Sequence, residues 1–467
     1  MTVMMQADEA RAADVPFLIE DPEFIPSRRY YDEAFFKLEN ERLWPHVWQM
    51  ACRLEEIPNV GDWVEYTLLD QSIIVVRTKE GVKAFHNACR HRGVKFASGG
   101  GNCEVQGFNC PFHGWRWNID GRNTFIYERR YFSEEALTRE DVNLLPCRVE
   151  LWGGCAFINF DDQAPPLRES LGSLADRLEA HNVDKLKVDW WHSAVLPVNW
   201  KLAMEAFMEG YHVMRTHPQL HVLTPPGMGL YGSEGASTKP PPGRVKSARD
   251  YVDLIIEFMR SLHTGMAGMI DPREMAIIEG LRDIELPEDL ALAPQAFFGR
   301  ANEEITRQGR EQGIPTPDLN AVAVTHPISA VEYIFPHYFL LPFFSAMSSY
   351  RVRPLTPETC LFEIWALSLH PDDEIRETPK APAPKSHDDP SFPEIPQQDY
   401  SNLPLQQLGL HSQGFDYMRL SKDVEGMISN YQRLIDGYLT GLDPAKLTKA
   451  TQVVCSGYDS PIRDLGF

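Results

Sequence analysis

Short runs of alternating apolar and polar positions follow one another between about residues 47 and 160. Between Val47 and about Phe160, β-type runs such as 63–68, 72–77 and 155–160 are separated by turn residues such as Asp120-Gly. This texture predicts a small antiparallel β domain over residues 44–165.

The rest of the chain alternates between helical and strand-like patterns. Residues 1–43, with a helix predicted over Asp32–Leu43, are expected to pack on a larger domain formed by residues 166–467. Further helices are predicted over 199–215 and 412–439, and strands over 190–196, 330–335, 338–352 and 359–369. We therefore expect an α+β protein, in which the small antiparallel β domain is joined to a larger domain with an antiparallel sheet flanked by helices. Residues 222–245, rich in Gly, Pro and Ser, predict a long loop.

Charge and cysteine content narrow the class of protein. The 467 residues carry 45 Lys+Arg against 66 Asp+Glu, a net charge of −21, which disfavours nucleic acid and anionic membranes as partners. Apolar stretches such as 338–344 are too short to span a bilayer, and the N-terminal residues lack the order of a signal peptide. The eight cysteines do not form a disulfide scaffold, so we expect a cytoplasmic protein.

Two Cys-His pairs lie in loops of the predicted β domain. Cys89 and His91 are followed, after 18 intervening residues, by Cys110 and His113. Two thiolates and two imidazoles can hold zinc or an iron–sulfur cluster. Because each loop offers one sulfur and one nitrogen, a two-iron cluster with the thiolates on one iron and the imidazoles on the other is favoured, and structural zinc is the alternative.

A second group of metal ligands is predicted around His212. On a helix, Glu205, Glu209 and His212 share one face, whereas His217 lies about 140° away from His212 on an ideal helix. Pro218 disfavours helix at the preceding residue, so a helix end there would let both histidines reach one ion. Two imidazoles and one carboxylate leave open positions on Fe(II) for oxygen.

These motifs together are typical of one family. The pattern Cys-x-His-x₁₈-Cys-x₂-His, with Pro111 and Trp115 beside His113, resembles the Rieske [2Fe–2S] domain of the large (α) subunit of ring-hydroxylating oxygenases. The resemblance covers residues 44–165 strongly and most of the remainder more loosely.

The resemblance implies the remaining site residues. It assigns Cys89, His91, Cys110 and His113 to the cluster and His212 and His217 to mononuclear iron, with the third ligand on a C-terminal helix. We expect that ligand to be Asp423, with Glu425 and Asp416 as alternatives. Glu209 stands where the family usually has an Asp that links the iron site to the cluster of a neighbouring subunit, and we expect it to act in catalysis. Ala206 replaces a frequent Asn, so ring dihydroxylation does not follow automatically.

The implied activity is that of a terminal oxygenase. Electrons would come from NAD(P)H through a ferredoxin or flavin reductase, and O₂ would hydroxylate an apolar small molecule, with an aromatic one preferred. Oxidative N- or O-demethylation or side-chain hydroxylation by a monooxygenase is the main alternative, and a Rieske electron carrier without oxygenase activity is another. The family also implies a homotrimer, with or without a small β subunit.

Overall fold

The computed structural model describes residues 14–138, 140–222, 245–266, 268–455 and 461–467. Nearly all of the loop predicted over 222–245 lies outside these residues. The chain divides into two compact units, one formed by 1–44, 168–375 and 381–467 and the other by 45–167 and 376–380. We call them the large unit and the small unit.

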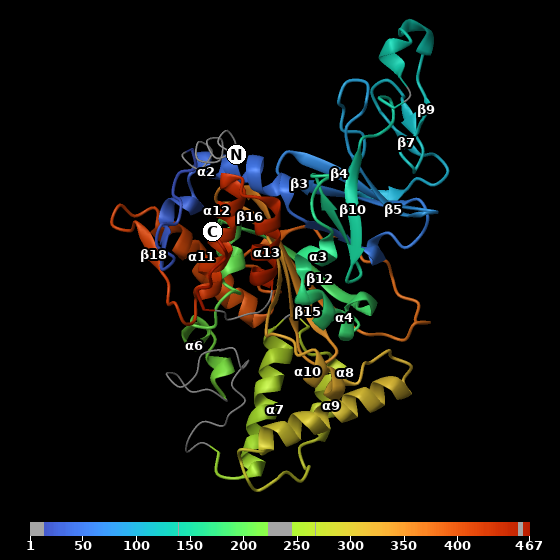
Figure 1. Cartoon of the computed structure of the whole chain (residues 1–467). Helices are drawn as coiled ribbons and strands as arrows, with labels where there is room; N and C mark the ends of the chain where they lie inside the picture. Colours follow the sequence, from blue (N-terminus) through green and yellow to red (C-terminus); the bar gives the residue numbers. More distant parts are fainter. Residues whose placement is uncertain (1–13, 139, 223–244, 267, 456–460) are drawn as a thin grey trace. The chain divides into compact units, whose positions relative to one another are not determined.

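A six-stranded sheet forms the centre of the large unit (Figure 1). Its order is β13 (Glu332–Ile334), β14 (Tyr338–Pro342), β15 (Met347–Thr356), β16 (Thr359–Ser368), β12 (Lys187–Leu196) and β17 (Lys385–Ser386). All neighbours are antiparallel except β12 and β17. β14 and β16 are almost entirely buried, which explains why most of their residues are apolar.

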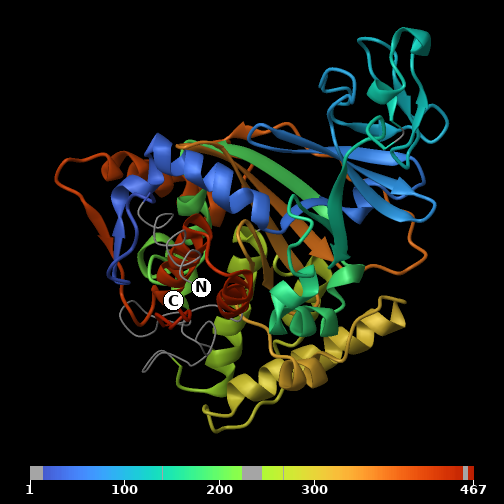
Figure 2. The same cartoon turned by 45° about the horizontal axis from the view of Figure 1, so that its top comes forward.

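Helices surround this sheet, and the turned view in Figure 2 separates them. They are α2 (Glu33–Leu38), α4 (Ser173–Ala180), α5 (Trp200–Glu205), α6 (Val213–Thr216), α7 (Ala248–Gly265), α8 (Pro272–Gly280), α9 (Ala293–Glu311), α10 (Leu319–Thr325), α11 (Glu394–Leu410), α12 (Gly426–Thr440) and α13 (Pro444–Cys455). α7 to α10 pack together at one end of the unit, and α12 lies against α13. A separate two-stranded sheet pairs β1 (Phe24–Pro26) with β18 (Tyr417–Arg419).

The N-terminal elements hold α5, the helix that leads into the predicted iron site. Buried Glu39, on a π-helical turn after α2, lies 2.6 Å from Lys201 Nζ and accepts the Trp200 indole N–H. Tyr30 donates its hydroxyl to Glu205 at 3.0 Å. The position of α5 is therefore fixed by residues that come more than 150 positions earlier in the chain.

The small unit is built on two antiparallel sheets. The larger has the order β2 (Gln49–Arg53), β11 (Cys155–Asn159), β10 (Pro146–Trp152), β5 (Gly81–His86), β4 (Gln71–Thr78), β3 (Asp62–Leu68) and β6 (Gly100–Asn102). The smaller contains β7 (Phe108–Asn109), β8 (Arg116–Trp117) and β9 (Asn123–Phe125). The predicted α+β class, with a small antiparallel β domain and a larger sheet flanked by helices, is confirmed.

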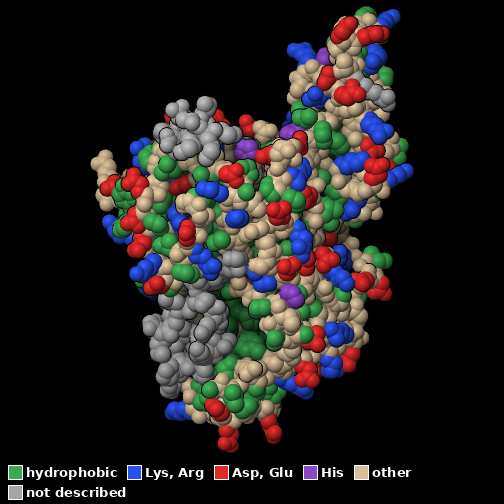
Figure 3. All heavy atoms as spheres, viewed as in Figure 1, with side chains coloured by type: hydrophobic (Ala, Val, Ile, Leu, Met, Phe, Trp, Pro, Cys, Tyr) green, Lys and Arg blue, Asp and Glu red, His purple; other side chains and the backbone are tan. Residues whose placement is uncertain are grey.

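The surface is highly charged. Figure 3 shows acidic and basic side chains interspersed over the face in view, with a hollow in its lower half that is lined by hydrophobic side chains. Among the described residues, no helix is both long enough and apolar enough to cross a membrane.

Candidate metal centres

The two predicted cluster loops have the same backbone turn. In the first, Cys89 donates its N–H to Val94 and accepts the N–H of Gly93, both at 2.8 Å. In the second, Cys110 donates to Trp115 at 2.9 Å and accepts from Gly114 at 3.0 Å. Gly93 and Gly114 have φ of 75° and 71°, a left-handed conformation that glycine adopts without steric cost. The sequence therefore builds one ligand loop twice.

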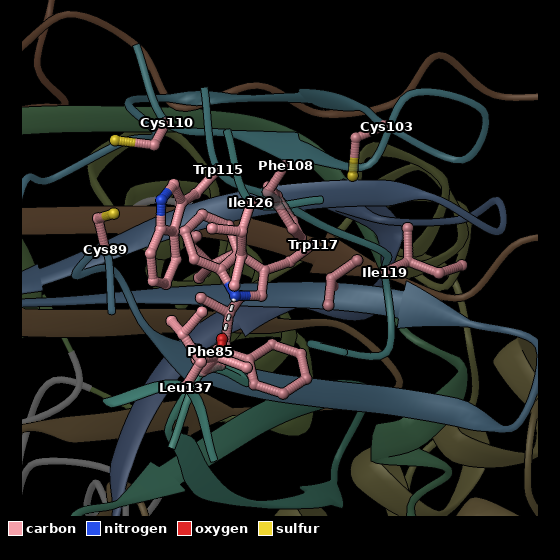
Figure 4. Packing of buried hydrophobic residues seen from close by; sticks show 14 residues of the cluster. Phe85, Cys89, Cys103, Phe108, Cys110, Trp115, Trp117, Ile119, Ile126 and Leu137 are labelled. Atoms are coloured by element: carbon pink, nitrogen blue, oxygen red, sulfur yellow. Dashed lines mark hydrogen bonds between the residues drawn. The ribbon is translucent and has the colours of Figure 1, made fainter. Parts of the chain in front are cut away.

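The side chains of these loops converge. His91 and His113 bring their Nδ1 atoms within 3.2 Å of each other and are partly exposed. Cys89 and Cys110 are buried, and Figure 4 shows their sulfur atoms at the same edge of the apolar cluster that contains Trp115 and Phe108. Burial, and next the neighbouring Cys110 thiol, raise the pKa of Cys89, and burial lowers the pKa of His91.

This donor set fits the expected cluster. Thiols lie on the inner side and imidazoles on the outer side, which is the division that a two-iron cluster with one Cys₂ and one His₂ iron requires. The His91 ring stacks on Trp115 with centroids 5.1 Å apart. Trp117 donates its indole N–H to Val142 O at 2.7 Å, which is the dashed line in Figure 4. The imidazole of His91, one of the expected ligands, is thus held by the apolar core.

The predicted helix over 199–215 is wrong in its middle. α5 ends at Glu205, and helix resumes only for the four residues of α6. Glu209 explains the restart, because its Oε2 accepts the His212 backbone N–H at 2.9 Å and so satisfies a donor at the beginning of α6. His217 ends α6 with ψ 69°, as expected before Pro218.

His212 and His217 meet at a buried carboxylate. One oxygen of Asp399, on α11, lies 3.1 Å from His217 Nε2 and 3.7 Å from His212 Nε2. Ligand atoms of the three residues all lie within 4.8 Å of one another. Two neutral imidazoles and one carboxylate suit Fe(II) with open positions, so the residues present fit a mononuclear iron.

Asp423 does not take part in this group, and the structure places Asp399 there instead. Residues 421–425 form a turn before α12, in which Asp423 is exposed. Asp416 is exposed as well. Glu425 is half-buried and accepts the Ser421 backbone N–H at 2.7 Å. Asp399 is only 5% exposed and is held beneath both histidines by α11.

The outer nitrogens of both histidines have partners. Glu209 Oε1 lies 2.6 Å from His212 Nδ1, and Gln398 Oε1 lies 2.6 Å from His217 Nδ1. Such contacts fix ring orientation and leave Nε2 for the metal. Burial opposes the charged form of His212, but the hydrogen bond with Glu209 and the nearby carboxylates raise its pKa overall.

Two cavities adjoin this group and share Ala206, Glu209, His212 and Asp399 in their walls. The first, of about 100 Å³, is lined otherwise by Phe207, Val213, His217, Leu220, Leu262, Met266, Met269, Ala330, Val331, Leu341 and Ile395. The second, of about 480 Å³, is more polar and includes Glu205, Thr216, Asn402, Gln406, Arg419 and Glu425. Among the described side chains that line the first cavity, only Glu209, Asp399 and the two histidines can carry a charge.

Sequence reasoning missed α11 and with it Asp399 and Gln398. No helix was predicted between residues 369 and 412, and Pro396 and Pro404 obscure the one that lies there. Apolar spacing does not reveal this helix either, because Leu405 and Leu408 are exposed whereas Asp399 and Gln407 are buried. The buried face of α11 is therefore evident only in the folded structure.

The fold and the donor sets define a protein with a Rieske-type cluster site in its small unit and a mononuclear non-haem iron site in its large unit. Residues 47–128 match the model of the Rieske [2Fe-2S] domain, and residues 183–441 match that of the ring hydroxylating alpha subunit (catalytic domain). The chain belongs to the ring-hydroxylating alpha-subunit family. The predicted family is confirmed, and with it the expected cofactors, a [2Fe–2S] cluster and a mononuclear iron.

Relatives in this family include monooxygenases and dioxygenases. The chain is 34% identical over 197 residues to the glycine betaine monooxygenase oxygenase subunit of Chromohalobacter salexigens, covering 42% of this chain and 43% of the relative. It is 32% identical over 232 residues to the biphenyl 2,3-dioxygenase subunit alpha of Rhodococcus jostii, covering 47% and 49%. The matches thus span about half the length of these relatives.

Solved structures support the same fold. The apo form of a quaternary ammonium Rieske monooxygenase superposes with a TM-score of 0.57 at 18% identity, over 90% of this chain and 96% of that one. Naphthalene 1,2-dioxygenase with bound indole gives a TM-score of 0.62 at 18% identity, over 95% and 97%.

Proposed function

We propose that this protein is the terminal oxygenase of a system that hydroxylates a small apolar molecule with O₂. The observation that carries the proposal is the convergence of His212, His217 and Asp399 at the wall of an apolar cavity. Insertion of one oxygen atom consumes RH, O₂, two electrons and two protons and yields ROH and water. A mononuclear iron supplies oxygen activation when it is bound at this group.

The chain's own residues have distinct roles in this proposal. Cys89, Cys110, His91 and His113 hold the cluster, whose electrons come from NAD(P)H through a ferredoxin or flavin reductase. His212, His217 and Asp399 hold the iron. The apolar cavity binds the substrate and excludes water from it.

Iron content tests the metal assignment directly. We expect three irons per chain in the native protein and two in Asp399→Ala, with an unchanged electron paramagnetic resonance spectrum of the reduced cluster. Asp423→Ala is the matched control and should keep three irons and full activity. Loss of iron from Asp423→Ala, with none from Asp399→Ala, would refute the assignment. A native content of two irons would favour an electron carrier, and a colourless protein containing zinc would favour a structural zinc site.

The apolar cavity favours a neutral, aromatic substrate, but the relatives give a second candidate. Similarity to glycine betaine and carnitine monooxygenases favours monooxygenation of a quaternary ammonium compound, of which oxidative N-demethylation is one form. Incubation with ¹⁸O₂, a reductase and a panel containing toluene, naphthalene, glycine betaine and carnitine would separate the two. Labelled hydroxylated hydrocarbons support the first candidate. Oxidation of an ammonium compound supports the second, with formaldehyde released if an N-methyl group is hydroxylated and trimethylamine released if the other carbon on nitrogen is hydroxylated.

We further propose that the subunits form a homotrimer in which the cluster of one copy serves the iron of the next. Support comes from aromatic side chains exposed near the cluster ligands: Phe112 is 58% exposed and Tyr131 is 75% exposed, and Arg92 and Arg130 lie over their rings. Such residues are typical of protein interfaces. Light scattering should give three times the chain mass, and a larger mass after co-expression would reveal a β subunit. Fractionation of the producing cell tests the expected cytoplasmic location.

A further inference from the structure

Gln398 contacts the ring nitrogen of His217 that faces away from Asp399. It directly precedes Asp399 on α11, so two consecutive residues contact the two nitrogens of one imidazole ring. Asp399 Oδ1 lies 3.1 Å from Nε2, and Gln398 Oε1 lies 2.6 Å from Nδ1. The ring is thus held from both sides by a single helical segment.

A second amide fixes how Gln398 is oriented. Gln219 donates its Nε2 to Gln398 Oε1 at 2.9 Å, and Gln398 donates its own Nε2 to Gln219 Oε1 at 3.3 Å. Because the amide nitrogen of Gln398 is engaged with Gln219, it is the carbonyl oxygen that faces His217. A carbonyl oxygen can only accept a hydrogen bond, so the proton of neutral His217 must be on Nδ1.

Gln219 connects the segment that carries His217 to the helix that carries Gln398. It lies two residues after His217 on a 3₁₀ turn (Pro218–Val222), so the amide pair joins that turn to α11. His212 differs, because its Nδ1 partner is the carboxylate of Glu209. The two histidines therefore have partners of different charge, one anionic and one neutral.

We infer that Gln398, oriented by Gln219, is a positioning residue that fixes the Nδ1–H form of His217 and directs its Nε2 lone pair towards Asp399 and the metal. The inference rests on the proposed iron site at these residues. Partners of this kind typically change metal affinity by roughly 10- to 100-fold when they are removed. The neutral amide also supplies the acceptor without adding another buried charge beside Asp399.

Metal affinity tests the inference without any need for turnover. Protein whose mononuclear site has been stripped, with the cluster intact, is dialysed against Co²⁺, and bound metal is quantified. Gln398→Leu should bind Co²⁺ roughly 10- to 100-fold more weakly. Gln398→Glu retains an acceptor and should bind at least as well as the native protein, while Gln219→Leu should give a smaller loss. The cluster spectrum should be the same in all variants.

Gln397→Leu is the matched control. Its amide donates to the backbone oxygens of Pro390 and Phe392 rather than to His217, so native affinity is expected. Equal losses in Gln397→Leu and Gln398→Leu would overturn the inference, as would a loss in Gln398→Glu as large as that in Gln398→Leu. Native affinity in Gln398→Leu with weak binding in Asp399→Ala would overturn the positioning role alone. Native affinity in both variants would overturn the metal site itself.

Discussion

Glu209 holds His212 by two atoms at once, with Oε1 2.6 Å from the imidazole Nδ1 and Oε2 2.9 Å from the backbone nitrogen. The same carboxylate therefore restarts the helix and orients the ring. Both hydrogen bonds are local, because the two residues are three positions apart. The longer side chain of Glu, compared with Asp, is used within the subunit to close this small ring of contacts.

Replacement of Glu209 by Gln tests what the charge of this side chain contributes to turnover. Gln keeps an acceptor but removes the charge, so we expect iron to be retained and turnover to fall by roughly 10- to 100-fold. Asp in the same place should retain the charge and recover part of the activity. Single-turnover rates with a pre-reduced cluster measure the effect, and Glu33→Gln, an exposed change on α2, is the control. Native rates in Glu209→Gln would contradict a role in catalysis.

The buried pair of Lys201 and Glu39 predicts a large effect on stability. Both side chains are 0% exposed and 2.6 Å apart. Lys201→Met would leave the Glu39 charge uncompensated, and the free energy of unfolding should fall by about 3–5 kcal/mol. The double variant with Glu39→Gln should recover much of this loss. Urea unfolding followed by circular dichroism measures both. Lys37→Met, at an exposed pair with Glu41, should change little.

Glu205 predicts a pH dependence of stability. Burial raises its pKa from 4.5 to about 7, despite hydrogen bonds from Gln432 and Tyr30. Between these values the folded state keeps a proton that the unfolded state has lost, so this residue's contribution to stability falls as pH rises from about 4.5 to about 7. Glu205→Gln removes the titration. Relative to the native protein, its unfolding free energy should increase by up to about 3 kcal/mol between pH 5 and pH 8.

The measurement is a set of denaturant curves for both proteins across that pH range. A constant difference between native protein and Glu205→Gln would show that Glu205 does not titrate there. Glu33→Gln, an exposed change, should give parallel curves.

The apolar cavity predicts how substrate range can be widened. Leu262, 5% exposed on α7, lines it, and Leu262→Ala should cost about 2–5 kcal/mol of unfolding free energy. The space gained should raise the relative turnover of bulkier hydrocarbons. Leu408→Ala, 70% exposed on α11, should leave both stability and product profile unchanged. Product ratios from paired substrates of different size check this, and equal profiles would place the substrate elsewhere.

The spacing of residues in the sequence was enough to predict candidate ligands that lie close together in the chain. Cys89 with His91, and Cys110 with His113, are local pairs in repeated turns, so the shape of each loop follows from local rules. His212 and His217 are also close in the chain. Pro218 correctly indicated that a helix ends just before it, because α6 ends at Thr216. These features depend on backbone geometry that a few neighbouring residues determine.

The third carboxylate could not be found in this way. Asp399 reaches the histidines through the packing of α11 against α7 and α5, across more than 180 residues of sequence. Several acids in the C-terminal region had similar local surroundings, so the choice of Asp423 had no physical constraint behind it. Only tertiary packing, which buries Asp399 and leaves Asp423 exposed, distinguishes them.

The large unit is discontinuous, with the small unit inserted between Trp44 and Arg168. Glu39 and Tyr30 precede the insertion, whereas Gln432, which also bonds Glu205, lies in the middle of α12. During synthesis on the ribosome, the inserted β unit can therefore fold while its host is still missing most of its sheet. The large unit, whose contacts join residues before the insertion to residues after it, can be completed only once α12 has been made.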